Sequence, residues 1–379
     1  MYRVLHIFSS YGGGISSLVL NLVNYSGKEY QFDTLAYSYQ GGDCFVASVE
    51  NSGGSCFLMP RVSTEGIGRN IAFLKNFFEK NIYDVIHCHI SGIDACLYKK
   101  LAKKNNQNVK FIIHAHSTRY DFAPYRLRIV RIINEYVNFK VSECFFYCSD
   151  LAANYSFNTK YLNQKPSYLI ANGVDINKYN FVISDEEIVK IKEEIGIPKD
   201  NKVIIHIGRF SKAKNHEFLL HVFKGINQNM SDTTLILVGD GELFDVTFEK
   251  SKIMGLENDV LFLGRRTDVA QLLKISDLML LPSLYEGLPT VGIECQATGT
   301  PLVLSDNVTK QTDLGFGLLT FLPLNNVDKW IEVSTLLLQD NGHTHHNNIF
   351  DIHEKGFTAQ AVGERYSNLL KAIIKGEIG

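Results

Sequence analysis

The segment that decides the fold reads LMLLPSLYEGLPTVGIECQATGTP and spans residues 278–301. Its first four residues, Leu278–Leu281, form a short apolar run that predicts a buried strand. A loop (residues 282–289) leads from this strand into a helix, and a second apolar run begins at Pro301. Strand, loop, helix and strand in this order are the repeating unit of a parallel α/β sheet.

Similar apolar runs recur in two series along the chain. The predicted strands are Val4–Phe8, Tyr83–His87, Lys110–His114 and Glu143–Cys148 in the first series, and Lys202–Ile207, Thr233–Val238, Val260–Leu263, Asp277–Leu281 and Pro301–Leu304 in the second. The turn signal Asn172-Gly-Val-Asp175 separates the series, and a capped helix begins after Ser184, with Glu187 three residues on. We therefore predict an α/β protein with two Rossmann-like, doubly wound domains, residues 1–171 and 172–357, that face one cleft. A last helix, within 358–379, is expected to pack back on the first domain.

Composition excludes several classes of protein. The chain has 379 residues with 38 basic and 40 acidic side chains, and this balance argues against a general nucleic-acid binder. No apolar stretch approaches the length of a membrane span, and the first residues read as a strand and not as a signal peptide. The seven cysteines include no CxxC pair, so we expect reduced thiols and a cytoplasmic location.

Two carboxylates stand out in the deciding segment. Glu286 lies in the loop before the helix, and Glu294 is expected about two turns into that helix. Set this way, they can accept hydrogen bonds from sugar hydroxyls at two depths of one pocket. The alternative is a capping carboxylate and a solvated helix glutamate.

Two cations follow the strand Lys202–Ile207. Arg209 lies at the strand end and Lys214 is expected at a helix N-terminus, an arrangement that suits a diphosphate. The alternative is a pair of surface cations. Further on, Gly239-Asp240-Gly241 permits close approach of a ligand to the backbone, and Gly264-Arg265 ends a strand where backbone groups can meet a base.

Together these residues resemble the GT-B glycosyltransferases of the family 4 type, also called glycosyl transferases group 1. The resemblance covers nearly the whole chain and rests on Glu286 with Glu294, Gly208-Arg209 with Lys214, Gly239-Asp240-Gly241, the linker Asn172–Asp175 and the glycine loop Gly12–Gly14. In character the chain looks most like bacterial capsular and exopolysaccharide transferases.

The resemblance implies a role for each matching position. Arg209 and Lys214 would hold the diphosphate of a nucleotide-sugar donor, most simply a UDP-sugar. Glu294 would bind the ribose hydroxyls, and Glu286 would contact the donor sugar. The backbone of Gly287 and Leu288 would lie beside the sugar and phosphate.

The resemblance also implies the activity. It predicts transfer with retained anomeric configuration, with no metal and no cofactor, to a carbohydrate or lipid-linked hydroxyl acceptor. Two other functions stay open. One is an inactive binding or scaffold protein on the same fold, and the other is a nucleotide-sugar epimerase or hydrolase.

The first glycine loop departs from the family pattern. The family commonly has Gly-Gly-X-Glu there, and this chain has Gly13-Gly14-Ile15-Ser16. The backbone role of Gly13 and Gly14 is kept, whereas any contact through the missing glutamate is lost or weakened.

Four histidines lie at predicted strand ends: His87, His89, His114 and His116. The resemblance places His114 or His116 at the family's active-site histidine, and the register of the strand favours His114. A metal site built from the four is an alternative, although zinc usually has a dedicated ligand shell. Three further histidines, in 341–348, read as part of a solvated loop.

Basic residues concentrate in residues 97–140, which hold ten lysines and arginines. Residues 1–171 carry a net charge of +6 and the remainder −8. The apolar and basic residues of 119–140 predict either contact with an anionic membrane, on the inner face of the plasma membrane, or a core helix with a solvated basic face.

Overall fold

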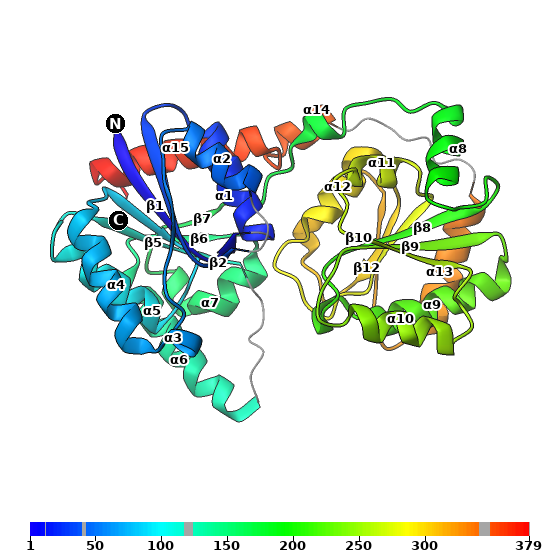
Figure 1. Cartoon of the computed structure of the whole chain (residues 1–379), viewed down its shortest axis with the longest axis horizontal. Coiled ribbons are helices and arrows are strands. Elements are labelled where there is room, and N and C mark those ends of the chain that lie inside the picture. The colour runs from blue at the N-terminus through cyan, green and yellow to red at the C-terminus, as the bar shows by residue number, and fades with distance from the viewer. Residues whose placement is uncertain (12, 40–42, 117–123, 341–348, 379) are drawn as a thin grey trace. The chain divides into compact units, whose positions relative to one another are not determined.

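The structure is a computed structural model that describes all residues except 12, 40–42, 117–123, 341–348 and 379. The chain forms two compact units (Figure 1). Unit 1 comprises Met1–Gly173 together with Gly356–Gly379, and unit 2 comprises Val174–Lys355. The histidine-rich loop within 341–348 lies outside the described residues.

Unit 1 contains a seven-stranded parallel sheet in the order β3-β2-β1-β4-β5-β6-β7. Its strands are β1 (Tyr2–Tyr11), β2 (Tyr30–Tyr39), β3 (Cys56–Leu58), β4 (Val85–Cys88), β5 (Lys110–Ala115), β6 (Phe145–Tyr147) and β7 (Ser167–Leu169). Most of their side chains are buried, as expected for a parallel sheet covered by helices.

The helices of unit 1 follow its strands and cover the sheet. They are α1 (Gly14–Tyr25), α2 (Asp43–Asn51), α3 (Val62–Glu65), α4 (Ile67–Lys80), α5 (Ile93–Lys103), α6 (Pro124–Val141), α7 (Asp150–Leu162) and α15 (Ala359–Lys375). The last helix, α15, returns to unit 1 and packs along α1 (Figure 1). Its apolar face, which includes Val362, Tyr366 and Leu370, joins the same core as Val4 and Phe146 of the sheet.

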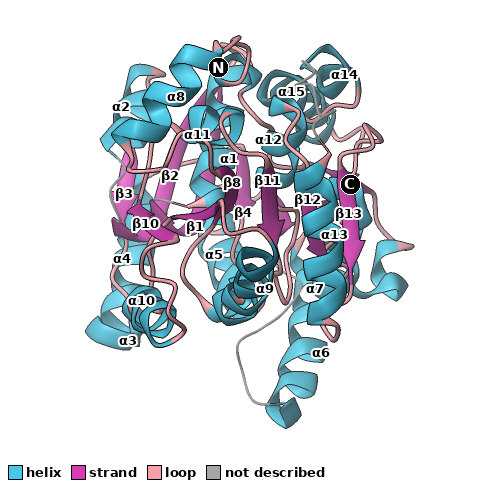
Figure 2. Cartoon of the chain, turned by 90° about the vertical axis from the view of Figure 1, so that its right-hand side faces the viewer, coloured by secondary structure: helices cyan, strands magenta, loops and turns pink. Residues whose placement is uncertain are grey.

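Unit 2 contains a six-stranded parallel sheet in the order β10-β9-β8-β11-β12-β13. Its strands are β8 (Lys202–Ile207), β9 (Thr233–Val238), β10 (Val260–Gly264), β11 (Leu278–Leu281), β12 (Leu302–Ser305) and β13 (Leu319–Leu322). In Figure 2 this unit faces the viewer, and α9 and α13 lie in front of its strands.

The helical segments of unit 2 include three short 3-10 turns, η1 to η3. The segments are η1 (Ile176–Lys178), α8 (Asp185–Glu194), η2 (Lys212–Lys214), α9 (His216–Asn229), α10 (Phe244–Ile253), α11 (Val269–Lys274), α12 (Thr290–Thr298), η3 (Lys310–Thr312), α13 (Val327–Gln339) and α14 (Ile349–Glu354). Helix α8 begins with the predicted capping box, in which Ser184 and Glu187 each accept a backbone hydrogen bond from the other residue.

Both units have the strand order of doubly wound folds, so the predicted fold class is confirmed. In unit 1 the order reverses between β1 and β4, and in unit 2 between β8 and β11. Loops that follow these strands meet at the carboxyl edge of each sheet, which is where such sheets bind ligands. Of the predicted site residues, Arg209 and Lys214 follow β8, and Glu286 follows β11.

Candidate active site

The site in unit 2 is built from four loops that follow β8, β9, β10 and β11. Backbone hydrogen bonds tie each of these loops to a neighbour, with donor and acceptor 2.8 Å apart in each case. The pairs are Phe210 N–H to Asp240 O, Gly239 N–H to Gly264 O, and Leu284 N–H to Ala213 O. The loops therefore form one connected surface, and the predicted donor-binding residues of unit 2 lie on or beside it.

Gly239 is required for this connection. Its φ is +139°, and a Cβ there would lie 2.1 Å from the Gly208 carbonyl oxygen. Any side chain would therefore separate the loops after β8 and β9.

Lys214 and Glu286 form a short ion pair in the middle of this surface. Lys214 Nζ lies 2.5 Å from Glu286 Oε1, and the two side chains are 15% and 17% exposed. Ser283 Oγ donates to the same carboxylate oxygen at 2.8 Å. Lys214 was expected at a helix N-terminus, but it lies in η2, and α9 begins at His216. The predicted diphosphate-binding lysine and sugar-binding glutamate are thus brought together, and each holds the other in place.

Glu294 lies deeper, on α12. The helix begins at Thr290, so Glu294 is one turn into it and not the two turns expected. Burial raises the pKa of its carboxyl group to about 7, although a hydrogen bond with Tyr179 and the charges of Lys178 and Lys214 oppose the rise. A carboxyl group with this pKa titrates near neutral pH. Any ligand that binds the ionised form better will therefore bind with a pH-dependent affinity.

Two exposed ion pairs form the outer part of the site. Arg209 lies 3.2 Å from Glu242, and Arg265 lies 2.6 Å from Asp240. Arg209 therefore pairs with a carboxylate other than that of Glu286. Exposed ion pairs contribute little to stability, so a bound anion can replace the carboxylate partner of Arg209 at small cost.

Gly287 and Leu288 lie in the loop between Glu286 and α12. The Leu288 side chain is buried, which fixes this loop to the body of unit 2 and leaves its backbone beside Glu286. The ligand contacts predicted for this backbone stay a prediction.

The glycine loop of unit 1 opens α1. Gly13 has φ +100° and precedes the first residue of the helix, Gly14. Ser16, which stands where the family pattern has glutamate, is buried and donates to the Gly13 carbonyl at 2.9 Å. Asn21 Nδ2 donates to the Gly173 carbonyl at 2.7 Å and so ties the linker to α1.

The four predicted histidines are packed together in unit 1, along with His6 of β1. His114 is 1% exposed, whereas His116 is half-buried. Two groups of three, His6-His87-His89 and His89-His114-His116, have nitrogen atoms within 4.8 Å of one another and are the candidate metal-ligand groups among the described residues.

Several contributing residues were missed by the sequence reasoning. Tyr179 follows the linker and bonds Glu294, although 115 positions separate them in the chain. Ser283 supports Glu286, and His6 joins the histidines from the middle of β1. The sequence could have indicated His6, because this histidine lies within the predicted strand Val4–Phe8. That strand pairs with the strand that ends at His87. Tyr179 had no such local signal.

Comparison with known families agrees with this geometry. Residues 12–178 match the family described as Glycosyltransferase Family 4, and residues 187–343 match Glycosyl transferases group 1. The two matches follow one another along most of the chain. The chain belongs to the group 1 glycosyltransferases, which confirms the resemblance stated from the sequence, and its fold is GT-B.

Relatives and solved structures match between 72% and 98% of this chain. The putative glycosyltransferase EpsF of Bacillus subtilis is 29% identical over 87% of this chain and 86% of its own. The Escherichia coli protein named UDP-Gal:alpha-D-GlcNAc-diphosphoundecaprenol alpha-1,3-galactosyltransferase is 27% identical over 72% of this chain and 73% of its own. The crystal structure of Anabaena HepE with UDP and glucose has a TM-score of 0.74 and 20% identity, and it covers 98% of this chain and 100% of that one.

Proposed function

We propose that this protein transfers a sugar from a nucleotide-diphosphate sugar to the hydroxyl group of a lipid-linked or polysaccharide precursor, in the synthesis of a capsule or exopolysaccharide. The observation that carries the proposal is the ion pair of Lys214 and Glu286 on the connected loops of unit 2, with the buried carboxyl group of Glu294 on α12 close enough to feel the charge of Lys214. A UDP-sugar is the favoured donor, since Anabaena HepE was crystallised with UDP and with UDP-glucose.

In this proposal the diphosphate of the donor takes the place of the Glu286 carboxylate beside Lys214. Glu286 then turns its oxygen atoms to the donor sugar, while Ser283 still donates a hydrogen bond to its carboxylate. Arg209 leaves Glu242 and contacts the same diphosphate. Cations that are already positioned offset the charge that develops on the leaving nucleotide, which is the usual largest contribution to such catalysis.

Glu294 binds the ribose of the donor. Its carboxylate accepts hydrogen bonds from vicinal hydroxyls, and Tyr179 holds it in the required orientation. The proposal includes retention of anomeric configuration and assigns no metal to the donor, since Arg209 and Lys214 supply the positive charge.

The acceptor side is assigned to unit 1, where α6 exposes an apolar stripe. Ile129, Ile132, Ile133 and Tyr136 are between 44% and 63% exposed and recur at the spacing of one helix face. With the basic residues of 97–140, this stripe is the combination that binds anionic membranes. No helix among the described residues is long and apolar enough to cross a membrane. We therefore propose peripheral contact through α6, which would bring the enzyme to a lipid-linked acceptor.

The donor assignment is tested with purified protein. Calorimetry with UDP-glucose, UDP-galactose and UDP-N-acetylglucosamine is expected to show binding of at least one, and transfer is then measured with a membrane fraction as acceptor. Lys214→Ala and Glu294→Ala should each lower transfer by about 100-fold or more. Lys252→Ala removes a similar charge from an exposed ion pair on α10 and should leave transfer unchanged.

Each alternative gives a different result. Full transfer by both site variants would show that the site is wrongly assigned. Release of free sugar without acceptor would indicate a hydrolase, and failure to bind any nucleotide sugar would favour a scaffold protein.

The membrane assignment has its own test. Ile132→Glu combined with Ile133→Glu should abolish cosedimentation with vesicles that contain phosphatidylglycerol. Leu336→Glu, at an exposed position on α13, is the matched control and should have no effect. Equal binding by the double variant and the control would exclude α6 as the contact.

A further inference from the structure

A cavity of about 540 Å³ lies at the amino edge of the sheet of unit 1. Asp84 precedes β4, Lys110 is the first residue of β5, and Glu143 precedes β6, and all three line the cavity. His89 and His116 follow β4 and β5 and lie at the opposite, carboxyl edge, where such sheets usually bind ligands. The cavity is therefore separate from the histidines, and it shares no residue with the site in unit 2.

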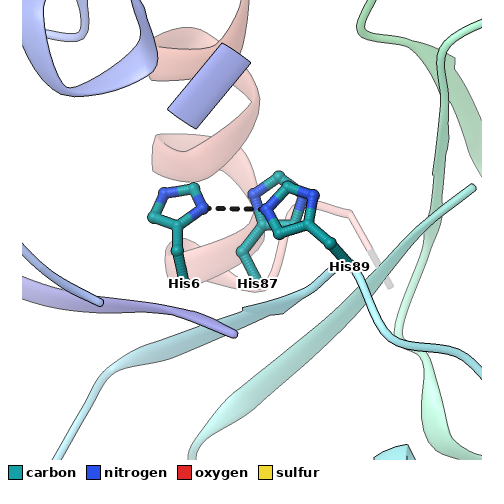
Figure 3. Close-up of side chains that lie close together, drawn as sticks. All are labelled: His6, His87 and His89. Atoms are coloured by element: carbon teal, nitrogen blue, oxygen red, sulfur yellow. Dashed lines mark hydrogen bonds between the residues drawn. The ribbon is translucent and has the colours of Figure 1, made fainter. Parts of the chain in front are cut away.

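Helix α15 connects the region of the histidines with this cavity. In the middle of the helix, the hydroxyl oxygen of Tyr366 lies 2.9 Å from Nδ1 of His87, whose ring stacks on that of His89 (Figure 3). Further along the helix, residues 374–376 line the cavity. Ile373, which precedes them, is buried in the core of unit 1. This part of the cavity wall is therefore fixed to the body of the unit.

The loop between α5 and β5 forms another part of the wall, with residues 106–110. Asn106 holds this loop in place from both ends of its amide group. Its Nδ2 donates to the Tyr83 carbonyl at 2.9 Å, and its Oδ1 accepts from the Asn108 N–H at 3.0 Å. The cavity is thus formed before any ligand arrives, as is usual for small-molecule sites.

Three lysines line the cavity: Lys103, Lys110 and Lys375. Lys103 and Lys110 are half-buried, and neither forms an ion pair with a carboxylate of the described residues. Lys375 lies 3.9 Å from Glu377, and both side chains are exposed. Burial lowers the pKa of the neighbouring Lys99, and the charge of Lys103 adds to this effect. An anion bound among these amines would offset their mutual repulsion.

Helix termini explain two of the three lysines. Lys103 and Lys375 lie in the last turns of α5 and α15, where a cation interacts favourably with the helix dipole. Lys110 begins a strand and gains no such interaction. The half-buried charge of Lys110 is therefore the one that most clearly indicates an anionic ligand.

The cavity also presents hydrogen-bond acceptors. Asp84 accepts the backbone N–H of Arg3 at 2.7 Å, and Glu143 accepts from Lys99 Nζ at 3.1 Å, each with one carboxylate oxygen. A carboxylate has about four lone-pair positions, so both can accept further hydrogen bonds. Gln107, which is exposed, adds an amide group. Hydroxyl groups match this part of the lining, whereas a second anionic group would be repelled by the carboxylates.

The lining offers no surface for a nucleotide base. Among the described residues that line the cavity none is aromatic, and its aliphatic side chains are those of Val109, which is buried, and Ile374. Bases bind mainly by stacking on aromatic side chains. The volume is within the range of about 300–1,000 Å³ that small-molecule sites have, but most such sites are lined by apolar groups. A lining this polar indicates a ligand with charge and hydroxyl groups but no base.

We propose that this cavity binds a sugar phosphate, with the phosphate group among Lys103, Lys110 and Lys375 and the sugar hydroxyls against Asp84 and Glu143. The site lies within unit 1 and uses none of the residues assigned to the nucleotide-sugar donor. It therefore does not rest on the proposed function, and either assignment can fail without the other.

NMR titration locates the ligand. Protein labelled with 15N and saturated with UDP is titrated with glucose 1-phosphate, galactose 1-phosphate, glucose 6-phosphate, glucose and inorganic phosphate. At least one sugar phosphate should shift the backbone signals of residues 106–110 and 374–376. Its Kd should be about tenfold or more below those of glucose and inorganic phosphate, because it gains the hydrogen bonds of both parts. No shift of these signals, or equal affinity for inorganic phosphate, would overturn the proposal.

A double substitution tests the lysines. Lys103→Gln with Lys110→Gln should weaken binding of the sugar phosphate by about tenfold or more, since hydrogen bonds to charged groups are lost. Lys100→Gln with Lys104→Gln is the matched control, because it removes the same charge from exposed residues that do not line the cavity. Urea unfolding checks that both variants are folded. Equal affinity of the two double variants would show that the phosphate is not bound here.

Acetylation of the wild type gives a test that needs no variant. The lysines are acetylated with and without the sugar phosphate, and mass spectrometry measures the rate at each position. The ligand should slow acetylation of Lys103, Lys110 and Lys375 and leave that of Lys100 unchanged. Equal rates with and without ligand at the three cavity lysines would overturn the proposal, whether or not the variants fold.

Discussion

Replacing Glu294 with glutamine should stabilise the protein in a pH-dependent way. The carboxyl group has a pKa of about 7 in the folded chain against an ordinary value of 4.5. Between these values the unfolded chain has released the proton and the folded chain has kept it, so the free energy of unfolding falls as pH rises and levels off above about pH 7. At about 1.4 kcal/mol per pKa unit, the full loss is about 3 kcal/mol. Glutamine does not titrate and can still accept the hydrogen bond from Tyr179.

The measurement is urea unfolding of the ligand-free wild type and Glu294→Gln at pH 5 and pH 8. The advantage of the variant should be about 2–3 kcal/mol larger at pH 8 than at pH 5. Glu257→Gln, at an exposed position of unit 2, makes the same charge change and should show no such difference. An equal advantage of Glu294→Gln at both pH values would refute a buried, titrating carboxyl group at this position.

The same substitution is expected to weaken binding of UDP by about 10- to 100-fold at pH 8, since hydrogen bonds to a charged group contribute about 1.5–3 kcal/mol. The affinity of the wild type for UDP should therefore rise between pH 6 and pH 8 relative to that of Glu294→Gln. UDP itself also titrates in this range, but it does so equally with both proteins, so the ratio of their affinities reports on Glu294 alone. Gain of stability with loss of binding is the pattern expected of a residue kept for function.

Two further predictions concern Tyr179 and Gly173. Tyr179→Phe removes the hydrogen bond that lowers the pKa of Glu294, so the pH midpoint of UDP affinity in calorimetry should move upward; an unchanged midpoint would contradict this contact. Gly173→Ala should lower the free energy of unfolding by about 1–3 kcal/mol in urea, because its Cβ would lie 2.7 Å from the Cα of Ala359. Gly68→Ala, in the open first turn of α4, should instead be neutral or raise it by up to about 1 kcal/mol, and equal effects of the two substitutions would show that crowding at Gly173 is unimportant.

The sequence predicted the strands best where a buried apolar run is bounded by polar residues. β8 and β9 have the predicted bounds, Lys202–Ile207 and Thr233–Val238. β2 was missed because polar side chains interrupt its apolar pattern. One of them, Asp33, is buried and pairs with Arg3, a partner that only the folded sheet provides. β3 and β7 have three residues each, too few to show a period.

The candidate site was predictable to the level of its loops but not of its contacts. The spacing of Glu286 and Glu294 places both carboxylates near one strand end, and the pattern around Arg209 and Lys214 places two cations near the next. Which cation meets which carboxylate depends on side-chain geometry: Lys214 bonds Glu286, whereas Arg209 bonds Glu242. Such pairings are set by the tertiary structure and leave no local pattern.

The return of α15 to unit 1 has a consequence for how the protein is made. Unit 2 is continuous in sequence, from Val174 to Lys355, and all of it leaves the ribosome before α15 does. Until then, the sheet face that carries the histidines has no Tyr366 and no apolar cover from this helix. Since domains fold as their chains emerge, the second unit can complete its core while the first still exposes part of its own. Order of synthesis and order of folding can thus be reversed, because residues translated after the whole of unit 2 complete the core of unit 1.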